Sequence, residues 1–539
     1  MTSLVAACMP HLVVAPILVP MLAAAAMLLA GEGRPRVKVG LGVASALAGI
    51  GASVALLGWV ATHGPVTYVP GGWPRTAGIA VVADRLSALL LVLAWALAGC
   101  VVVFGAARWH RAGVHFHPLV QLELMGLSGA FLAGDVFNLF VFFEILLAAS
   151  YGLVLHGAGR SRIGAGLRYV AVNLAASSLF LVGATMLYGV TGTLNLAALA
   201  EHLARVSASD RGLLHAGAAI LAVAFLAKAA AWPLNFWLVP AYAAATAPAA
   251  ALFAILTKVG VYALVRTSAL FAAGGAPSAP GADVLFAFGT ATAVLAALGM
   301  LGTHRLPHQA GLSVVVSAGT LLAALGLGRE ATGGALYYLA SSVLSASALF
   351  LLIDLVERWQ NTGTTLQEPA PFLTPALERS EVNLDDEEEP LVGVPFPGSV
   401  AFLGLAFLAC TLLVAGLPPL SSFVGKVLML TGALGARAGA AVPGRVWIFL
   451  GVLLGTGLVT LVALTRTGIR TFWAGSRDAP RPQIRLAEGL PIVLLLGASL
   501  GLALGAGPVS RYATEAARAL AGEAARPAAA PAAAAEGAP

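Results

Sequence analysis

The sequence predicts an all-α polytopic membrane protein that crosses the bilayer about fourteen times. Hydrophobic residues make up 59% of its 539 positions and charged residues only 10%, and the mean hydropathy is +0.91. A soluble domain of this size would not stay dispersed with that balance. Apolar runs of about 18–25 residues recur along the chain, and each is long enough to cross a bilayer as a helix.

The apolar runs define fourteen expected spans. The runs at 398–416 and 419–436 count as one broken span, because Pro418 and Pro419 separate them and proline removes a backbone donor. The spans are expected at 9–30, 39–61, 79–107, 117–133, 135–156, 165–190, 212–238, 246–271, 284–303, 309–328, 332–356, 398–436 (broken), 445–466 and 487–507.

Basic residues occupy alternate loops between these spans. They follow the first, third, fifth, ninth and thirteenth spans, at Arg34, Arg108, Arg160, Arg305 and Arg466 among others. All five loops lie on one side if the span count is right. The positive-inside rule then places that side in the cytoplasm and both termini outside.

Prolines interrupt two spans, each close to a lysine, and this arrangement suggests an internal repeat. Pro233 lies five residues after Lys228, and Pro418-Pro419 lie shortly before Lys426, five spans further on. Transporters commonly place ion sites at such breaks, although a simple proline kink is also common in membrane helices.

We therefore divide the chain into five regions. A surface helix is expected within 192–208, and a polar insert at 357–397 carries an acidic run at 384–390. The regions are N-terminal spans at 1–110, a first repeat at 111–271, a second repeat at 282–470 that includes the insert, a loop and last span at 471–510, and an Ala/Pro-rich disordered tail at 511–539.

Several classes of site have no support in the sequence. The net charge is +6, but the arginines are scattered through short loops and form no basic face for nucleic acid. The three cysteines share no metal-ligand spacing, and no Gly-rich phosphate loop occurs. No cofactor is therefore expected, and whether a metal ion binds stays open.

Three of the chain's four lysines lie inside apolar spans. They are Lys228, Lys258 and Lys426, and Lys228 is the deepest in its segment. A buried lysine can lose its proton near neutral pH, whereas arginine stays charged. Lysines inside the bilayer therefore suggest charge movement, and the alternative is that they snorkel to an interface.

Glu144 is the natural partner for one of these lysines. Apolar residues flank it for nearly two turns, so its carboxylate cannot easily reach either interface. An intramembrane carboxylate is costly unless it is paired. We predict a Glu144–Lys228 pair whose coupled charges exchange a proton, as in a proton pump or antiporter, with a static salt bridge as the alternative. Asp84 and Arg85, which open the third span, could neutralise each other as an adjacent pair.

Four further residues are secondary candidates for proton transfer. Asp135 begins the Glu144 span and is more typical of a helix entry, while Glu123 lies in the preceding span. His304 and His308 flank a span beside basic loops, where they could pass protons to the cytoplasm.

Three motifs resemble one family. The segments GDVFNLFVFFEILLAASYGLVLHG, AKAAAWPLNFWLVPAYAAATAPAAALFAILTKVGVYALVR and AGLPPLSSFVGKVLML are similar to the antiporter-like subunits shared by respiratory complex I and the Mrp cation/proton antiporters. The resemblance covers about residues 75–470 and is greatest to the D-type member of the Mrp subunits. It implies fourteen helices, two inverted five-helix repeats and a hydrated polar axis at mid-membrane.

The resemblance also implies roles for the charged residues. Glu144 and Lys228 would be the coupled pair, Lys258 the central relay and Lys426 the terminal lysine of the second repeat. One departure concerns the eleventh span, where Ser341-Ser342 stand at a position that related subunits usually fill with histidine.

The resemblance implies a subunit of a multisubunit Na⁺(K⁺)/H⁺ antiporter, a secondary transporter and not an enzyme. Its partners would be the other subunits of a hetero-oligomeric complex, Na⁺ or K⁺, protons and membrane lipid, in a bacterial inner membrane. One alternative is a proton-pumping subunit of a complex I-like NADH-quinone oxidoreductase or membrane-bound hydrogenase. Another is an assembly scaffold whose polar axis is inactive.

Overall fold

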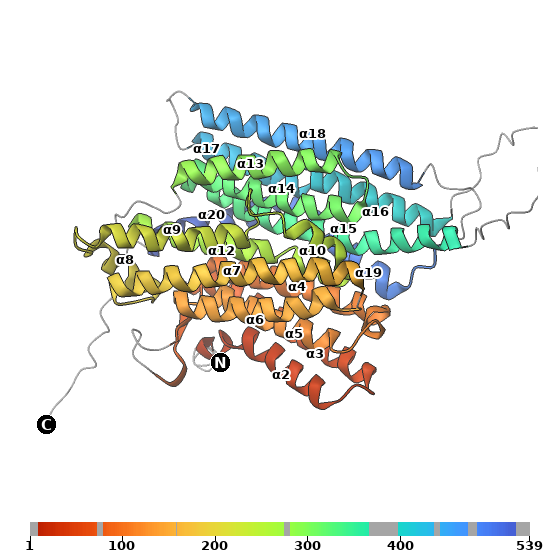
Figure 1. Ribbon diagram of the computed structural model, residues 1–539, viewed down its shortest axis with the longest axis horizontal. Helices are drawn as coiled ribbons and strands as arrows, with labels where there is room; N and C mark the ends of the chain where they lie inside the picture. The colour runs from red at the N-terminus through yellow and green to blue at the C-terminus, as the bar shows by residue number, and fades with distance from the viewer. Residues whose placement is uncertain are drawn as a thin grey trace, which may run out of the picture.

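The computed structural model describes residues 9–72, 79–157, 159–273, 281–365, 397–435, 442–472 and 482–523. Nearly all of these residues are helical, as their apolar runs predict. Figure 1 shows long, roughly parallel rods, with α2 at one edge of the bundle and α18 at the opposite edge. Helices satisfy every backbone group within the segment, which is the requirement that a bilayer imposes.

The helices follow one another along the chain with short connections. Their bounds are α2 Ala15–Leu29, α3 Pro35–His63, α4 Arg85–Ala107, α5 Phe116–Leu132, α6 Val136–Leu155, α7 Arg160–Thr191, α8 Leu196–Ala204, α9 Arg211–Lys228, α10 Leu238–Ala244, α11 Ala247–Phe253, α12 Leu256–Ala273, α13 Ala282–Leu301, α14 Leu306–Leu327, α15 Arg329–Thr365, α16 Gly398–Ala415, α17 Ser421–Gly435, α18 Gly444–Phe472, α19 Leu486–Leu504 and α20 Ala506–Glu523. Two single-turn 3₁₀ helices, η1 Pro70–Gly72 and η2 Trp109–Arg111, and a short antiparallel hairpin, β1 Val66–Tyr68 with β2 Val81–Ala83, complete the described elements.

The expected span count is confirmed in the described part of the chain. Twelve helices are long and apolar enough to cross a membrane, with α11 and α12 counted as one. The shorter α2 and the 17-residue α5 pack in the same bundle and bring the number to fourteen, with the short α17 counted as the second half of the broken span that begins with α16. The predicted class, an all-α polytopic bundle with two broken helices, is thus the observed one, and the division into two five-helix repeats stays a prediction.

Both predicted breaks are present. The first separates α9, which ends at Lys228, from α10, and the second separates α16 from α17. At the second break Gly416 takes a left-handed φ of 76°, and the Leu417 amide donates to the Leu412 carbonyl. This glycine-terminated ending satisfies one of the last carbonyls of α16 before the two prolines begin.

Helix α13 packs closely on α14. A Cβ atom added at Gly289 would lie 2.2 Å from the backbone nitrogen of Ala323, and one at Gly319 would lie 2.5 Å from that of Ala293. Small residues let two membrane helices approach backbone to backbone. This contact positions α14, which carries Ser317, beside α13.

The predicted surface helix and polar insert can be compared with the structure. The surface helix expected within 192–208 is α8, which lies at one end of the bundle (Figure 1). Helix α15 continues to Thr365, so the first part of the expected insert at 357–397 is helical, and its acidic run at 384–390 lies outside the described residues.

The prediction of a disordered tail from residue 511 is wrong as far as residue 523. Helix α20 covers this stretch and packs against α15 and α4. Alanine is the best helix former, and Ala513, Ala516 and Leu520 are buried on one face of α20. Residues 524–539 lie outside the described part of the chain.

Candidate functional site

The three membrane lysines are buried, and none snorkels to an interface. Their exposed fractions are 4% for Lys228, 1% for Lys258 and 9% for Lys426. Each amine donates a hydrogen bond to an acceptor on a different element. A buried ammonium is expensive unless it finds such partners, so these contacts define the candidate site.

Lys228 is the last residue of α9, at the first break. Its Nζ donates to Ser177 Oγ on α7 at 3.0 Å and lies 4.9 Å from the centre of the Phe143 ring. The hydroxyl and the negative face of the aromatic ring both favour the charged amine. Gly260 on α12 permits this packing, because a Cβ there would lie 2.6 Å from the Ala229 backbone nitrogen.

Glu144 is near Lys228 but does not contact it. The carboxylate is close enough to act electrostatically on the amine, yet no ion pair within 4.0 Å joins them among the described residues. Glu144 Oε1 is buried and has no hydrogen-bond partner there. The direct ion pair predicted from the sequence is therefore not formed, because Ser177 takes the amine.

Lys258 lies near the start of α12, at the centre of the bundle. Its Nζ donates to Ser317 Oγ on α14 at 2.5 Å, and Ser317 in turn donates to the Val314 carbonyl at 2.8 Å. The serine hydrogen is thus committed to the backbone, which leaves its oxygen lone pairs for the lysine.

Lys426 is held in the second break. Its Nζ donates to the carbonyl oxygen of Ala415, the last residue of α16, at 2.7 Å. Gly416 makes room for the amine, because a Cβ there would lie 2.5 Å from Nζ. Gly457 on α18 lies on another side, where a Cβ would come 3.5 Å from Nζ. The break frees the acceptor that this lysine uses.

A cluster of three serines lies one turn from Lys426. Ser341 Oγ on α15 lies 2.7 Å from Ser421 Oγ and 2.8 Å from Ser422 Oγ at the start of α17. All three side chains are buried. Ser341 thus joins α15 to α17 through neutral hydroxyls.

The sequence did not single out Ser177, Ser317, Ser421 or Ser422. Serines are numerous in the chain, and nothing in their local pattern marks the two that accept from lysines or the two that contact Ser341. For Ser421 and Ser422, their position between the two prolines and Lys426 was a signal that could have identified them.

Two of the secondary candidates are carboxylates at very different depths. Asp135 caps α6 by accepting from the Asn138 amide at 2.6 Å, which confirms its interpretation as a helix-entry residue, and burial raises its pKa. Glu123 has no exposed surface, and neither of its carboxylate oxygens has a hydrogen-bond partner in the described part of the chain.

The two histidine candidates lie around the start of α14. His304 is exposed in the preceding loop, where partial loss of hydration and the positive charges of Arg470 and Arg466 hold its pKa below the ordinary value. His308 is half-buried in the first turn of α14. The hydrogen bonds of the three lysines go to other residues, and a role for the two histidines stays a prediction.

The ends of the bundle are held by long-range ion pairs. Asp84, which caps α4, pairs with Arg266 of α12, while its neighbour Arg85 pairs with Glu515 of α20. The adjacent Asp84 and Arg85 therefore do not neutralise each other, contrary to the possibility raised from the sequence. The pKa of Asp84 is low: burial opposes its ionisation most strongly, but the Arg266 charge and the hydrogen bonds from Arg266 and Ser87 together outweigh that effect.

The opposite end contains a denser network. Glu488 of α19 accepts from Arg108 at 2.9 Å and from Arg358 at 2.9 Å. Arg485 donates to the Ala107 carbonyl at 2.7 Å. This end, where Arg108, Arg160 and Arg305 also lie, is called the arginine-rich end below.

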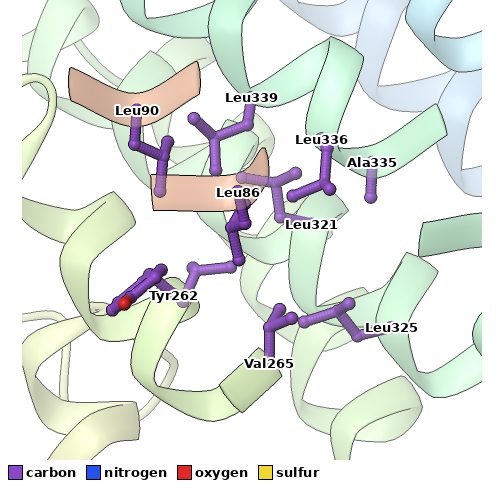
Figure 2. Close-up of a pocket in the computed structure, with 10 residues that line it drawn as sticks. Leu86, Leu90, Tyr262, Val265, Leu321, Leu325, Ala335, Leu336 and Leu339 are labelled. Atoms are coloured by element: carbon purple, nitrogen blue, oxygen red, sulfur yellow. The ribbon is translucent and has the colours of Figure 1, made fainter. Parts of the chain in front are cut away.

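An apolar cavity lies inside the bundle, and none of the three lysines or their serine partners lines it. Figure 2 shows its lining from α4, α12, α14 and α15, including Leu86, Leu321 and Leu339. It measures about 10 Å³, enough for a single water that would find no polar partner. The Tyr262 hydroxyl donates instead to the Phe131 carbonyl. The cavity is therefore no cation site, and the described residues contain no group of side chains that could hold a metal ion.

Comparisons with known proteins agree with this architecture. Residues 133–370 match the family described as "NADH:quinone oxidoreductase/Mrp antiporter, TM". The chain is 47% identical to a Rhizobium meliloti protein named as the D subunit of a probable K⁺/H⁺ antiporter, covering 93% of this chain and 94% of that one. It is 32% identical to the D subunit of a Na⁺/H⁺ antiporter of Bacillus subtilis, over 95% and 97% of the two chains.

A solved structure has the same fold. The match is to a chain of the Mrp complex from Dietzia sp. DQ12-45-1b, with a TM-score of 0.79 and 25% identity. It covers 95% of this chain and 98% of the matched chain. The similarity therefore extends over the broken helices and the helices that carry the lysines.

Proposed function

The chain belongs to the NADH:quinone oxidoreductase/Mrp antiporter family and, within it, to the D subunits of cation/proton antiporters, and from this we propose that it is a subunit of a multisubunit Na⁺(K⁺)/H⁺ antiporter. It is a transporter subunit and not an enzyme. Its relatives are named for K⁺/H⁺ or Na⁺/H⁺ exchange, which supports both cations as candidate substrates. The partners are the other subunits of that complex.

One observation carries the proposal: three buried lysines and the half-buried carboxylate of Glu144 lie inside a bundle that offers the lysines mainly neutral partners. Lys228 and Lys258 donate to serine hydroxyls, and Lys426 donates to a backbone carbonyl. A lysine kept only for stability would be expected to have a carboxylate in contact. Neutral acceptors allow each amine to gain and lose a proton with little rearrangement.

The proposed proton path follows these residues. The Lys228 amine moves between Ser177, where it lies in the structure, and Glu144, which has an unpartnered oxygen nearby. Closing the pair with Glu144 holds the amine's proton, and opening it releases that proton toward Lys258. Lys258 and Ser317 continue the path, which the hydroxyl cluster at Ser341 connects to Lys426.

The proposed membrane orientation follows from charge. The arginine-rich end faces the cytoplasm of a bacterial inner membrane, and both termini lie outside. The loops that contain Arg34, Arg108, Arg160 and Arg305 support this orientation.

The test uses everted membrane vesicles from cells that lack their own Na⁺/H⁺ antiporters and express the complete complex. A proton gradient is imposed without NADH as the electron donor, and NaCl or KCl is then added. The proposal predicts that at least one cation dissipates the gradient, and that vesicles lacking this chain do not respond. A complex that ignores both cations but requires this chain for a gradient built by NADH oxidation would indicate the redox pump instead.

A further inference from the structure

Glu123 is a buried carboxyl group that is not part of the proton path proposed for Glu144 and the lysines. It lies in α5, has no exposed surface, and neither carboxylate oxygen has a hydrogen-bond partner among the described residues. No basic side chain in that part of the chain forms an ion pair with it. An ionised carboxylate without a donor or a counter-charge would be strongly disfavoured there, because burial removes the water that stabilises the charge.

Two tyrosines lie near this carboxyl, beyond hydrogen-bond distance of its oxygens. Tyr169 of α7 and Tyr242 of α10 are close enough for Glu123 to act on them electrostatically. The Tyr242 hydroxyl donates to the Phe253 carbonyl at 2.9 Å. Ser150 donates to the Leu147 carbonyl at 2.7 Å, so its 2.7 Å contact with the Tyr169 hydroxyl uses the tyrosine hydrogen.

The hydrogens of these hydroxyls are therefore committed elsewhere, while the oxygens of Tyr169 and Tyr242 keep free lone pairs. Neither tyrosine therefore has a hydrogen to offer an ionised Glu123, and neither lies within hydrogen-bond distance of its carboxyl oxygens. A protonated carboxylic acid, with its single hydrogen, is the form of Glu123 that fits this site. These contacts therefore favour the neutral acid form of Glu123, and no ion pair opposes it among the described residues.

Tyr151 is the hydroxyl placed to bridge this group and Glu144, although it contacts neither carboxyl in the structure. Its hydroxyl is buried and has no hydrogen-bond partner in the described residues, so its hydrogen is uncommitted. The Tyr151 ring packs edge to face on Tyr169, with ring centres 5.4 Å apart. Tyr151 lies two turns after Glu144 on the same face of α6, and Glu144 acts on it electrostatically.

Depth along the membrane gives the direction of transfer. Glu123 is seven residues from the start of α5 at the arginine-rich end, or roughly 10 Å along the helix. Glu144 is eleven residues from the end of α6 at that same side, or roughly 16 Å. Glu123 therefore lies between the arginine-rich end and Glu144.

We propose that Glu123 is a proton-binding site that exchanges its proton with Glu144 through the Tyr151 hydroxyl. In the transfer, Tyr151 gives its hydrogen to the Glu144 carboxylate and regains one from the Glu123 carboxylic acid. Glu123 is then ionised until a proton from the arginine-rich end restores it. This site deepens the proposed antiporter function and rests on it for the use of the proton, but not for the protonated state of Glu123.

Two measurements on the intact complex test separately whether Glu123 is protonated and whether its proton is used in exchange. The first is the difference infrared spectrum in H₂O and D₂O, in which a protonated carboxyl gives a carbonyl stretch that shifts on deuteration. The second is cation-induced proton exchange in vesicles. The variants are Glu123→Gln, which keeps the shape but cannot release a proton, and Tyr151→Phe, which removes only the hydroxyl. Ser128→Ala on α5 is the control, because it also removes a buried, unpartnered polar group.

Wild type and Tyr151→Phe should show the carboxyl band, and Glu123→Gln should lack it. Exchange should fall at least tenfold in Glu123→Gln and several-fold in Tyr151→Phe, with Ser128→Ala unchanged. A band that persists in Glu123→Gln, or exchange as fast there as in Ser128→Ala, overturns the proposal. Lys228→Ala is measured alongside: if it also exchanges at the wild-type rate, the antiporter mechanism itself fails, whatever the infrared result. If Glu123→Gln does not assemble, Glu123→Asp takes its place and should keep the band.

Discussion

The amine of Lys228 donates to the hydroxyl of Ser177 at 3.0 Å and does not contact Glu144. The pair expected from the sequence is thus held open by a third residue. A lysine amine with one neutral acceptor and one nearby carboxylate can form its hydrogen bond with either group. We infer that this choice between partners is what lets the first repeat hold and release a proton.

Replacing Ser177 with alanine should therefore slow exchange. The variant loses the acceptor of a charged hydrogen bond, worth about 1.5–3 kcal/mol, so we expect a loss of roughly tenfold or more. Cation-induced proton exchange in vesicles measures it. Ser178→Ala is the matched control, because the exposed Ser178 hydroxyl donates to the Leu174 carbonyl of its own helix and not to a lysine among the described residues. Equal rates in the two variants would contradict a role for Ser177.

Gly416→Ala should displace Lys426. The new Cβ would lie 2.5 Å from Nζ, and the left-handed φ of 76° would add strain of about 1–3 kcal/mol. We expect a lower yield of the complex and roughly tenfold slower exchange per complex, because the charged bond to Ala415 is lost. Gly404→Ala, inside α16, places its Cβ where no described atom lies within 4 Å and should change neither quantity. A fully active Gly416→Ala complex would show that the break does not position Lys426.

The Asp84–Arg266 pair should matter for stability. Arg266→Ala leaves a buried carboxylate without its partner, at a cost of about 3–5 kcal/mol. Arg85→Ala breaks a more exposed pair with Glu515 and should cost about 0–1 kcal/mol. The temperature at which the purified complex loses half its folded signal should fall clearly for the first variant and little for the second. The reverse order would mean that Asp84 finds another partner.

The spans, the breaks and the buried lysines could be predicted because each has a local cause. Apolar length specifies a span, proline specifies a break, and a lysine flanked by apolar residues has no route to an interface. The partners of those lysines could not be predicted. Ser177 is 51 residues from Lys228, and Ser317 is 59 from Lys258, so only tertiary packing brings them together.

Two errors have the same origin. The ion pair of Asp84 with Arg266 joins helices far apart in the sequence, so its neighbour Arg85 was the more obvious partner. Helix α20 was missed because its buried face is made largely of alanine, a weak hydrophobic signal. In both cases the deciding contact is long-range and leaves little trace in the local sequence.

The membrane charges should form a graded series. Glu144→Ala should abolish exchange, Lys258→Ala should reduce it severely, and Lys426→Ala should reduce it at least in part, with little loss of assembled complex. The order follows from position: Glu144 is the proposed partner of the Lys228 switch, whereas Lys426 ends the path. Exchange rates at matched complex levels measure it. Full activity in all three variants would leave an assembly scaffold as the better explanation.

The most direct test of the central claim compares wild type, Lys228→Ala and Lys38→Ala. Lys38 is also buried, at 8% exposure, but lies in α3 away from the proposed path. Cation-induced dissipation of an imposed proton gradient is recorded in everted vesicles with equal amounts of complex. We predict that Lys228→Ala abolishes the response and that Lys38→Ala retains it. A wild-type response from Lys228→Ala would contradict a proton path through this lysine.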